Sequence, residues 1–471
     1  MTFATAAWPT TPLPHSGLPG LLWPALPAPA ARQMLALQWQ LEHSQWLPPE
    51  TLAQRQLTQL RALCAHALAQ SPWYRELLAR ELPELDGLAA APERLTWDLF
   101  ARWPLLPKAA LASQQAALFA SRYPPEHGEF YWISTTGSTG VPVQVAHTQT
   151  SQLMRSALNL RHLLWHGIDL RKTYGEIHFD RARERLANWG EGIASVYPTG
   201  AAATINSAAA LDEQLAWLLA EKPAHLHAKG GNLRALLLLA RERGAALEGL
   251  QTLLPYAENL PPDLRDLARE VCGARVIDIY SCAEAGTLAL QCPHHTHYHA
   301  QSEGVLLEVL DDAGRACAPG QIGQVVLTHL SNFAMPLIRY ALGDYAQVGA
   351  PCDCGRGLPV LTRIMGRGRN MAVDPDGRRF WPAFPAADWI AIAPLRQVQL
   401  VQHTPREIEM RYVMDRALSE VESGQLTQAL RARLGYAYEM RYTRVESITR
   451  TAREKYEDFV SLCAPDAQGQ A

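Results

Sequence analysis

The sequence lacks an excess of charge of either sign, because 43 basic and 46 acidic side chains leave a formal net charge of −3. A balance this close to zero gives no reason to expect a nucleic acid or an anionic membrane as a partner. The eight cysteines are scattered apart from Cys352 and Cys354, which is not the spacing of a disulfide framework. A reducing, cytoplasmic setting fits this cysteine usage best.

Long apolar runs are also missing at the N-terminus. Apolar residues gather over 18–31, but Pro24, Pro27 and Pro29 interrupt them, and Arg32 is the first Lys or Arg of the chain. This pattern predicts neither a signal peptide nor a membrane span. We expect residues 1–30 to form a Pro- and Ala-rich arm, and the sequence contains no internal repeat.

A loop rich in hydroxyls and glycine is the most informative stretch. It follows the strand-like run 130–133 and precedes a second strand-like run, and it reads Ser134, Thr135, Thr136, Gly137, Ser138, Thr139 and Gly140. Glycine lets backbone N–H groups approach an anion closely, and hydroxyls add neutral donors, so a phosphate chain is a natural guest. A polar hairpin turn is the simpler alternative. The loop lacks the Gly-Lys-Ser/Thr ending of a Walker A motif, which excludes a P-loop NTPase.

The periodicity along the chain predicts an α/β protein. Helical spacing covers much of 32–119 and recurs at 149–168, 202–220, 232–243 and 262–271, and strand-like runs lie at 174–179, 250–255 and 274–280. Helices alternating with strands of this length predict crossover units and a mostly parallel sheet. Ligands bind at the carboxyl ends of such strands, where Tyr256 to Glu258 and Ser281 to Glu284 are expected.

The pattern changes to alternating β segments from Gly304, with strands expected at 305–310, 323–330, 335–339 and 345–348. After a hairpin-type turn at 374–377, strands at 397–402, 407–413 and 436–445 and a helix at 418–434 suggest a small α+β domain. We therefore expect a large N-terminal domain over 31–367, with a β-rich subdomain at about 304–366, and a small mobile C-terminal domain over 368–471.

Several stretches occur in a characteristic order behind the loop. They include Glu258, Glu284, the run from Ile338 to Asp344 and Gly366-Arg367; earlier and later stretches lie at 67–75, 105–108 and 450–455. In this order they resemble the AMP-forming adenylating enzymes, and more narrowly the phenylacetate–coenzyme A ligase branch and its capsule-biosynthesis relatives. The resemblance covers about residues 57–460.

The resemblance implies ATP-dependent activation of a carboxylic acid and gives several residues a role. Thr135, Thr136, Gly137, Ser138, Thr139 and Gly140 would cradle the β- and γ-phosphates. Glu284 would help to hold Mg²⁺, which prefers oxygen ligands. Tyr280 would pack on the adenine beside Ala257 and Glu258, and Asp344 would accept hydrogen bonds from both ribose hydroxyls. Arg367 would be a cation near the ribose and phosphate at the hinge. Taken singly, Asp344 is also compatible with a cap or turn, Glu284 with a surface acid and Tyr280 with a core aromatic.

Lys455 matches the lysine that bridges carboxylate and α-phosphate in relatives. Relatives reach that lysine through glycines, whereas Ala452, Arg453 and Glu454 precede it here, so a surface helix is the alternative. Val141, Ser281 and Asn370 are further departures, since many relatives carry a lysine, a glycine and an acid there. Tyr256 also stands where relatives often have glycine.

A zinc site is also indicated. Cys292 opens a segment with four histidines, and Cys352 and Cys354 follow much later; thiolate and imidazole are the ligands zinc prefers. A surface histidine cluster with free cysteines is the alternative. Spacing leaves the fourth ligand open, with His294 and His297 among the candidates; the resemblance favours His299 and a structural site.

Three functions are compatible with the sequence. The first is a carboxylate–coenzyme A ligase, with an aryl or arylacetic acid suggested by analogy alone. The second is a biosynthetic adenylating enzyme that passes the acyl group to a carrier-protein thiol or an amine. The third is a non-catalytic descendant that binds a nucleotide. The sequence does not determine which acid is activated or which acceptor receives the acyl group. The oligomeric state is also open, and a homodimer is one of the possibilities.

Overall fold

A computed structural model describes residues 13–21, 23–134, 143–382, 387–446, 448 and 457–463. Its contacts divide the chain into two compact units. Unit 1 comprises Met1–Tyr174, Arg185–Ala203 and Ile279–Arg363, and unit 2 comprises Gly175–Glu184, Thr204–Asp278 and Ile364–Ala471. The expected boundary between a large and a small domain at 367/368 stays a prediction.

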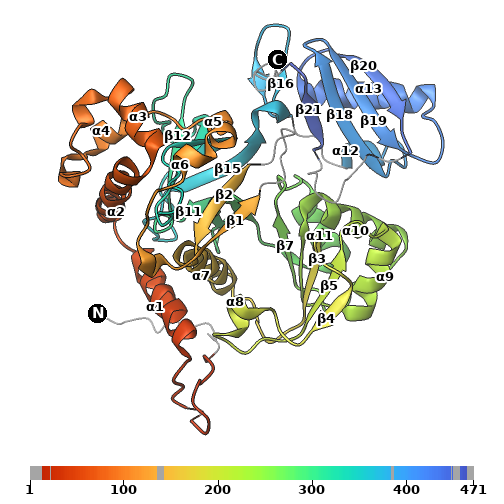
Figure 1. The fold of residues 1–471 in the computed structure, drawn as a ribbon. Helices are drawn as coiled ribbons and strands as arrows, with labels where there is room; N and C mark the ends of the chain where they lie inside the picture. Colours follow the sequence, from red (N-terminus) through yellow and green to blue (C-terminus); the bar gives the residue numbers. More distant parts are fainter. Residues whose placement is uncertain are drawn as a thin grey trace. The chain divides into compact units, whose positions relative to one another are not determined.

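Unit 1 begins with helices, as the periodicity predicts (Figure 1). Proline at the first position starts the three longest of the early ones, where its missing N–H costs no intrahelical hydrogen bond. Ser71 alone separates α2 from α3. The helices are α1 (Pro29–Ser44), α2 (Pro49–Gln70), α3 (Pro72–Glu81), α4 (Trp97–Ala101), α5 (Lys108–Ser113), α6 (Gln115–Leu118), α7 (Gln149–Trp165) and α8 (Glu191–Ala194), with short 3₁₀ turns η1 (Pro83–Leu85), η2 (Pro92–Arg94) and η3 (Pro125–His127).

A seven-stranded sheet in the order β12-β13-β14-β15-β11-β10-β9 forms the β-rich part. The pairs β12–β13, β13–β14, β11–β15, β10–β11 and β9–β10 are antiparallel. The sheet includes three strands that precede Gly304, so it begins earlier in the chain than the expected β-rich segment. Its strands are β9 (Ile279–Cys282), β10 (Gly286–Gln291), β11 (Tyr298–Ala300), β12 (Val305–Leu310), β13 (Ile322–His329), β14 (Tyr340–Val348) and β15 (Val360–Arg367).

A separate hairpin carries the hydroxyl-rich loop. Strands β1 (Phe130–Ser134) and β2 (Gln144–Thr148) pair antiparallel in unit 1, with Ser134 opposite Gln144. This confirms the two strand-like runs on either side of the loop. Thr148 then caps α7, because its hydroxyl accepts a hydrogen bond from the Ser151 N–H at 3.2 Å.

A six-stranded sheet with the order β4-β5-β3-β6-β7-β8 lies mainly in unit 2. Strands β6, β7 and β8 are parallel, which confirms the predicted crossover units. Helix α10 lies between α9 and α11 (Figure 1). The elements are β3 (Tyr174–His178), β4 (Glu184–Leu186), β5 (Ala202–Asn206), α9 (Leu211–Glu221), β6 (His225–Lys229), α10 (Gly230–Glu242), β7 (Thr252–Tyr256), α11 (Leu264–Cys272) and β8 (Arg275–Val276).

The last part of unit 2 is the predicted α+β segment. The sheet β20-β19-β18-β21 packs with α13 around a core that includes Leu400, Met410 and Leu426. A capping box of Ser419 and Glu422 starts α13, and Gly435 ends it at φ +71°. Its elements are η4 (Gly368–Asn370), β16 (Ala372–Val373), β17 (Arg379–Phe380), α12 (Ala387–Ile390), β18 (Gln397–Thr404), β19 (Glu407–Val413), α13 (Glu420–Leu434), β20 (Glu439–Arg444) and β21 (Phe459–Ser461).

Three expected elements are wrong in detail. The helix expected at 202–220 starts only at Leu211, because the buried run from Ala202 forms β5. The strand expected at 274–280 is two strands, β8 and β9, in different sheets. No strand covers 335–339; Arg339 has φ +49°, and β14 begins at Tyr340. Each error concerns a short apolar run, for which periodicity does not determine the structure.

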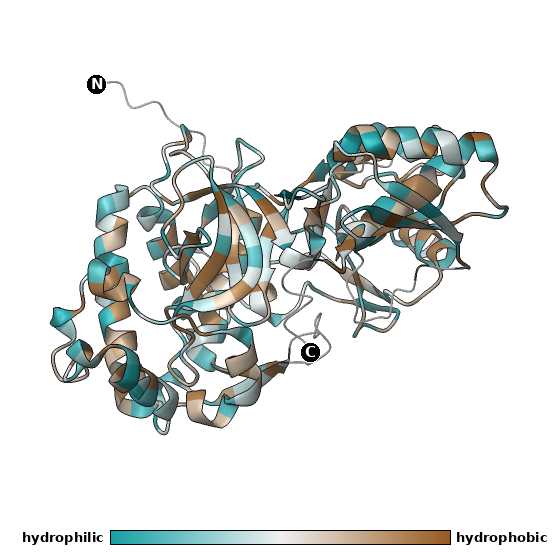
Figure 2. Cartoon of the chain, turned by 90° about the horizontal axis from the view of Figure 1, so that it is seen from above, coloured by the Kyte–Doolittle hydropathy of each residue, from teal (hydrophilic) through white to brown (hydrophobic). Residues whose placement is uncertain are grey.

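The helices carry both hydrophilic and hydrophobic residues. Figure 2 shows hydrophilic and hydrophobic residues on the same helices, as expected for helices with one face in a core. Within the described residues, no helix combines the length and apolar character that a membrane crossing requires.

Candidate active site

Glu284 lies at the turn of the hairpin between β9 and β10, in unit 1. The pairing of Cys282 with Gly286 leaves three residues for this turn, so the carboxylate is presented at its tip. Its side chain is buried, and its Oε1 accepts a hydrogen bond from the Tyr340 hydroxyl at 3.2 Å. The prediction that this segment ends a parallel strand is wrong, because it lies between two strands of the antiparallel sheet. The carboxylate still has the environment of a site residue, being buried with a polar partner.

Asp344 and Tyr280 form the second contact of this part of unit 1. The Tyr280 hydroxyl donates to Asp344 Oδ2 at 2.9 Å, from β9 to β14. Gly343 precedes the aspartate with φ +84°, a conformation that glycine adopts without strain. The structure therefore joins two residues 64 positions apart, which the sequence analysis assigned to the same nucleotide.

Arg339 connects the early helices with β14, a role that the sequence analysis did not foresee. Its buried guanidinium donates to the carbonyls of Ala101 and Trp103 at 2.5 and 2.6 Å and pairs with Glu308. The backbone of Leu106 bonds Arg339 and Ala341 on either side of Tyr340. The stretches at 105–108 and 338–344 are thus neighbours in space. In the sequence, the only indication of this contact is that both stretches are among the motifs that carry the family resemblance.

Unit 2 contains the predicted nucleotide residues Ala257, Glu258 and Arg367. Ala257 follows β7 with φ +62°, and Glu258 Oε2 accepts a hydrogen bond from the Gly231 N–H at 2.9 Å, at the start of α10. An anion at a helix N-terminus is favourable. The half-buried Arg367 ends β15, and its backbone N–H donates to Asn370. The expected position of Glu258 after a parallel strand is confirmed.

Three aromatic rings gather near the C-terminal ends of β3, β6 and β7 in unit 2. Tyr256 stacks on His227 with ring centroids 4.4 Å apart and lies 5.3 Å from the His178 ring. Glu176 on β3 is close to His227 and bonds Arg181 at 2.8 Å. Burial opposes its ionisation, but His227 and Arg181 lower the pKa of Glu176 to about 2. The sequence gives no prediction of this aromatic group, although each ring lies at or near the end of a strand.

Two buried histidines of unit 1 lie close together, one on the loop-bearing hairpin and one on β13. The rings of His147 on β2 and His329 on β13 are 5.6 Å apart, and His147 stacks on Tyr131 of β1. Burial and the charge of Arg155 lower the pKa of His147 to about 4. Burial, His147 and Arg155 lower the pKa of His329 to about 3. Both rings are therefore neutral near pH 7.

Two predicted groups lie outside the described residues. They are the loop residues Thr135, Thr136, Gly137, Ser138, Thr139 and Gly140, and Lys455. Their roles remain predictions from the sequence.

The predicted zinc ligands come together in unit 1. One ligand atom from each of Cys292, His299, Cys352 and Cys354 lies within 4.8 Å of all the others. The Cys292 and Cys352 sulfurs are 4.0 Å apart, and Cys354 Sγ is 3.4 Å from His299 Nε2. A tetrahedral zinc ion would separate two sulfurs by about 3.8 Å and a sulfur from a nitrogen by about 3.5 Å, given its usual bond lengths. The residues present therefore fit zinc.

The neighbours of this cluster favour His299 among the histidines. Its other ring nitrogen, Nδ1, lies 3.4 Å from the Leu358 carbonyl oxygen, which leaves Nε2 toward the thiols. His297 Nε2 lies 3.1 Å from the Cys352 sulfur, but His297 is not one of the four grouped ligands. His294 is exposed and is not among them.

The cysteine loop is fixed to the corner between α1 and α2. The Arg356 guanidinium lies between the rings of Trp46 and Trp165, 4.6 and 4.4 Å from their centroids, and Arg356 Nε donates to Gln45. Gly357 N–H donates to the Gln45 carbonyl at 2.9 Å, and a Cβ at Gly357 would lie 1.8 Å from the Leu47 carbonyl oxygen. The loop conformation thus depends on glycine and on a cation between two aromatic rings.

A parallel α/β sheet, an antiparallel sheet that carries Glu284 and Asp344, and a final α+β segment match the fold of adenylating enzymes. A family model described as AMP-binding enzyme matches residues 53–334, and the chain belongs to this family.

Individual relatives agree with this assignment. A phenylacetate–coenzyme A ligase of Thermus thermophilus is 24% identical over 345 residues, covering 69% of this chain and 73% of the relative. A crystal structure of 2-hydroxyisobutyryl-CoA ligase in the postadenylation state has a TM-score of 0.70 at 20% identity, covering 89% of this chain and 91% of that one. An anthranilate CoA ligase with anthranoyl-AMP has a TM-score of 0.53 at 18% identity, covering 69% and 64%. At these identities the solved structures establish the fold.

Proposed function

We propose that this protein activates a carboxylic acid with ATP, forming an acyl-adenylate and pyrophosphate, and transfers the acyl group to the thiol of coenzyme A. The observation that carries the proposal is the pair of contacts Tyr340–Glu284 and Tyr280–Asp344, in a chain of the AMP-binding enzyme family. The names of the relatives, which are coenzyme A ligases, support the same reaction.

The chemistry requires two anions to meet, so the protein must position them and offset their charge. The acid's carboxylate oxygen attacks the α-phosphorus, a new P–O bond forms, and the bond to the departing pyrophosphate breaks. Asp344 would accept hydrogen bonds from the ribose hydroxyls while Tyr280 orients its carboxylate. Glu284 would hold Mg²⁺, which supplies positive charge to the phosphate oxygens.

The remaining roles rest on the resemblance. The loop Thr135 to Gly140 would hold the departing phosphates, and Lys455 would neutralise charge between carboxylate and α-phosphate. Ala257 and Glu258 would border the adenine, and Arg367 would add a cation near the ribose. Glu258 gains support from its bond to the Gly231 N–H, which fixes the segment after β7.

An aryl or arylacetic acid is the proposed substrate class. The name of the Thermus thermophilus relative supports it. So does the stack of Tyr256, His227 and His178 at strand ends in unit 2, because aromatic faces bind aromatic rings in offset or edge-on contacts.

The cluster of Cys292, His299, Cys352 and Cys354 is proposed to bind one structural zinc ion. Its four ligands fill a tetrahedral shell, so no position remains for water or substrate. Stabilisation of the sheet and the cysteine loop is therefore the proposed role.

The test is carboxylate-dependent ATP–pyrophosphate exchange across a broad acid panel, followed by incubation with coenzyme A, a phosphopantetheinyl carrier protein or amines. We expect exchange with an aryl acid and a coenzyme A ester as product. Exchange without any coenzyme A ester would favour transfer to a carrier protein or an amine. No acid-dependent exchange, together with an Asp344→Ala variant that behaves like the parent, would favour a non-catalytic nucleotide-binding protein.

A further inference from the structure

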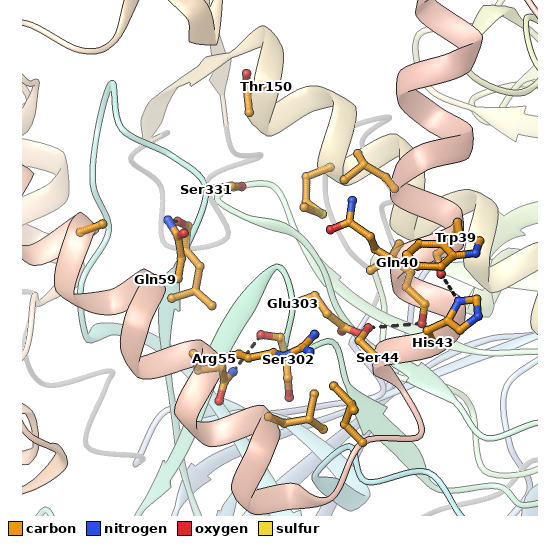
Figure 3. A pocket seen from close by; sticks show the side chains of 18 of the residues that line it. Trp39, Gln40, His43, Ser44, Arg55, Gln59, Thr150, Ser302, Glu303 and Ser331 are labelled. Carbon is orange, nitrogen blue, oxygen red and sulfur yellow. Dashed lines mark hydrogen bonds between the residues drawn. The ribbon is translucent and has the colours of Figure 1, made fainter.

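A cavity of about 790 Å³ lies in unit 1 between α1, α2, the start of α7 and the loops that adjoin β12 and β13 (Figure 3). Its volume is in the range of small-molecule sites. None of the residues assigned above to ATP, Mg²⁺ or zinc lines it. The cavity therefore needs its own explanation.

Hydrogen bonds fix the walls of this cavity. Gln38 on α1 donates to the Ala157 carbonyl of α7 at 2.5 Å. On α2, Gln56 donates to the Ser302 carbonyl at 2.9 Å and Gln59 donates to the Leu330 carbonyl at 3.0 Å. Three separate side chains thus connect the helices to one another and to the loops. Such walls hold a preformed space, which lowers the ordering cost of binding.

The lining is mainly apolar. Aliphatic and aromatic side chains contribute from both helices, from α7 and from the loop after β13, namely Leu37, Leu41, Leu52, Met154, Leu330 and Phe333. A ligand with an apolar body would be removed from water here, which is favourable in proportion to the area buried.

The charged groups of the lining leave a surplus positive charge. Glu303 is paired with the buried Arg161, whose guanidinium nitrogens lie 3.1 and 3.2 Å from its oxygens, and Ser44 donates to it at 2.5 Å. Arg55, which lines the same cavity from α2 (Figure 3), makes no hydrogen bond or ion pair with the described part of the chain. Burial lowers the pKa of His127, another lining residue, so its ring adds little positive charge near pH 7. Arg55 is an exposed side chain, so its guanidinium is accessible to an anion that enters the cavity.

We propose that this cavity is a second ligand site, which binds an amphipathic monocarboxylate with its carboxylate on Arg55 and its apolar part against the leucines, Met154 and Phe333. A guanidinium matches a carboxylate with two parallel N–H donors. One cation beside an apolar wall selects against a cationic ligand and favours an anionic ligand over a neutral one. The site is independent of the adenylation reaction proposed above.

Calorimetric titration of the full zinc-loaded chain without nucleotide tests this site. The probes are octanoate, phenylacetate, octan-1-ol and octylamine. We expect saturable binding of a carboxylate and at least tenfold weaker binding of the alcohol and the amine. The octanoate and phenylacetate arms distinguish an aliphatic chain from an aromatic ring as the apolar part.

Matched variants locate the binding. Ala62→Phe places a ring into the cavity from an exposed position of α2, and Ala69→Phe makes the same change at an exposed position of α2 that does not line it. Arg55→Gln removes the cation, and Arg80→Gln removes an exposed arginine of α3. Ala62→Phe should weaken carboxylate binding at least tenfold and Arg55→Gln about fivefold, as for a partly exposed ion pair. Both controls should bind like the parent.

Several results would overturn the proposal. These are octan-1-ol binding as tightly as octanoate, unchanged binding in Arg55→Gln and Ala62→Phe, or equal losses in the controls. Pyrophosphate exchange, measured on the same proteins, distinguishes binding in this cavity from binding in the proposed active site. A loss of exchange and of binding together in Ala62→Phe would assign the titration signal to the active site and refute a second site. Absence of exchange in the parent, with binding still sensitive to Ala62→Phe, would count against the proposed reaction and leave this site supported.

Discussion

Acid should weaken the part of unit 1 that carries the hydroxyl-rich loop, because His147 and His329 are buried as neutral rings. Their pKa values are about 4 and about 3 in the fold, against an ordinary value near 6.5 in an unfolded chain. At pH 5 the unfolded chain therefore binds protons that the folded chain does not. Stability must fall as the pH drops below about 6.5, and it continues to fall until the folded rings titrate.

The size of the effect follows from these values. Between pH 7 and pH 5, each ring should lower the free energy of unfolding by on the order of 2 kcal/mol, since one pKa unit corresponds to about 1.4 kcal/mol. His147→Gln or His329→Gln should each remove roughly half of the combined pH dependence, about 2 kcal/mol of about 4. The intrinsic cost of either substitution cancels when the two pH values are compared for one variant.

Hydrogen–deuterium exchange of peptides from β1, β2 and β13 measures this difference, after correction for the intrinsic exchange rate at each pH. His15→Gln is the control, because His15 is an exposed histidine of the N-terminal arm. Variants that retain the full pH dependence of the parent would refute the assignment of acid sensitivity to this pair.

Three other predictions address the proposed active site and the proposed zinc site. Tyr280→Phe removes the 2.9 Å bond to Asp344 and should raise the KM for ATP about fivefold, as expected for one hydrogen bond; an unchanged KM in pyrophosphate exchange would contradict the ribose assignment. Cys354→Ser should reduce bound zinc from one ion per chain to well below one and lower the Tm by several degrees, measured by metal analysis and calorimetry. One zinc ion retained in that variant would exclude Cys354 as a ligand. The double change Ser138→Ala and Thr139→Ala should raise the KM for ATP while circular dichroism stays unchanged, and unaltered ATP kinetics would count against the phosphate loop.

The sequence was most informative where a local pattern determines the structure. The strands on either side of the hydroxyl-rich loop, the crossover units at β6 and β7, and the capped helix α13 all follow from period, glycine and cap residues. It failed at the buried run of β5 and at 335–339. There, tertiary contacts decide: Arg339 adopts a positive φ while its guanidinium bonds the carbonyls of Ala101 and Trp103.

The candidate site could be predicted only in part for the same reason. The order of Glu284 and Asp344 along the chain indicated a shared nucleotide, but neither residue predicts its tyrosine partner. Cysteine spacing indicated zinc, yet only the pairing of β11 with β15 brings His299 close to the later cysteines. The aromatic stack around Tyr256 requires three strands to end at one edge, which periodicity alone does not reveal.

The position of the cysteine loop explains why a closed metal site would be useful in this protein. The loop joins β14 to β15, and Arg356 fixes it to the corner between α1 and α2 through Trp46 and Gln45. Because β14 also carries Asp344, a zinc ion that holds the two cysteines to Cys292 and His299 would restrain one end of the strand that presents the proposed ribose ligand. Loss of the metal should therefore first loosen the Cys352–Cys354 turn and its arginine contact, and only then the carboxylate.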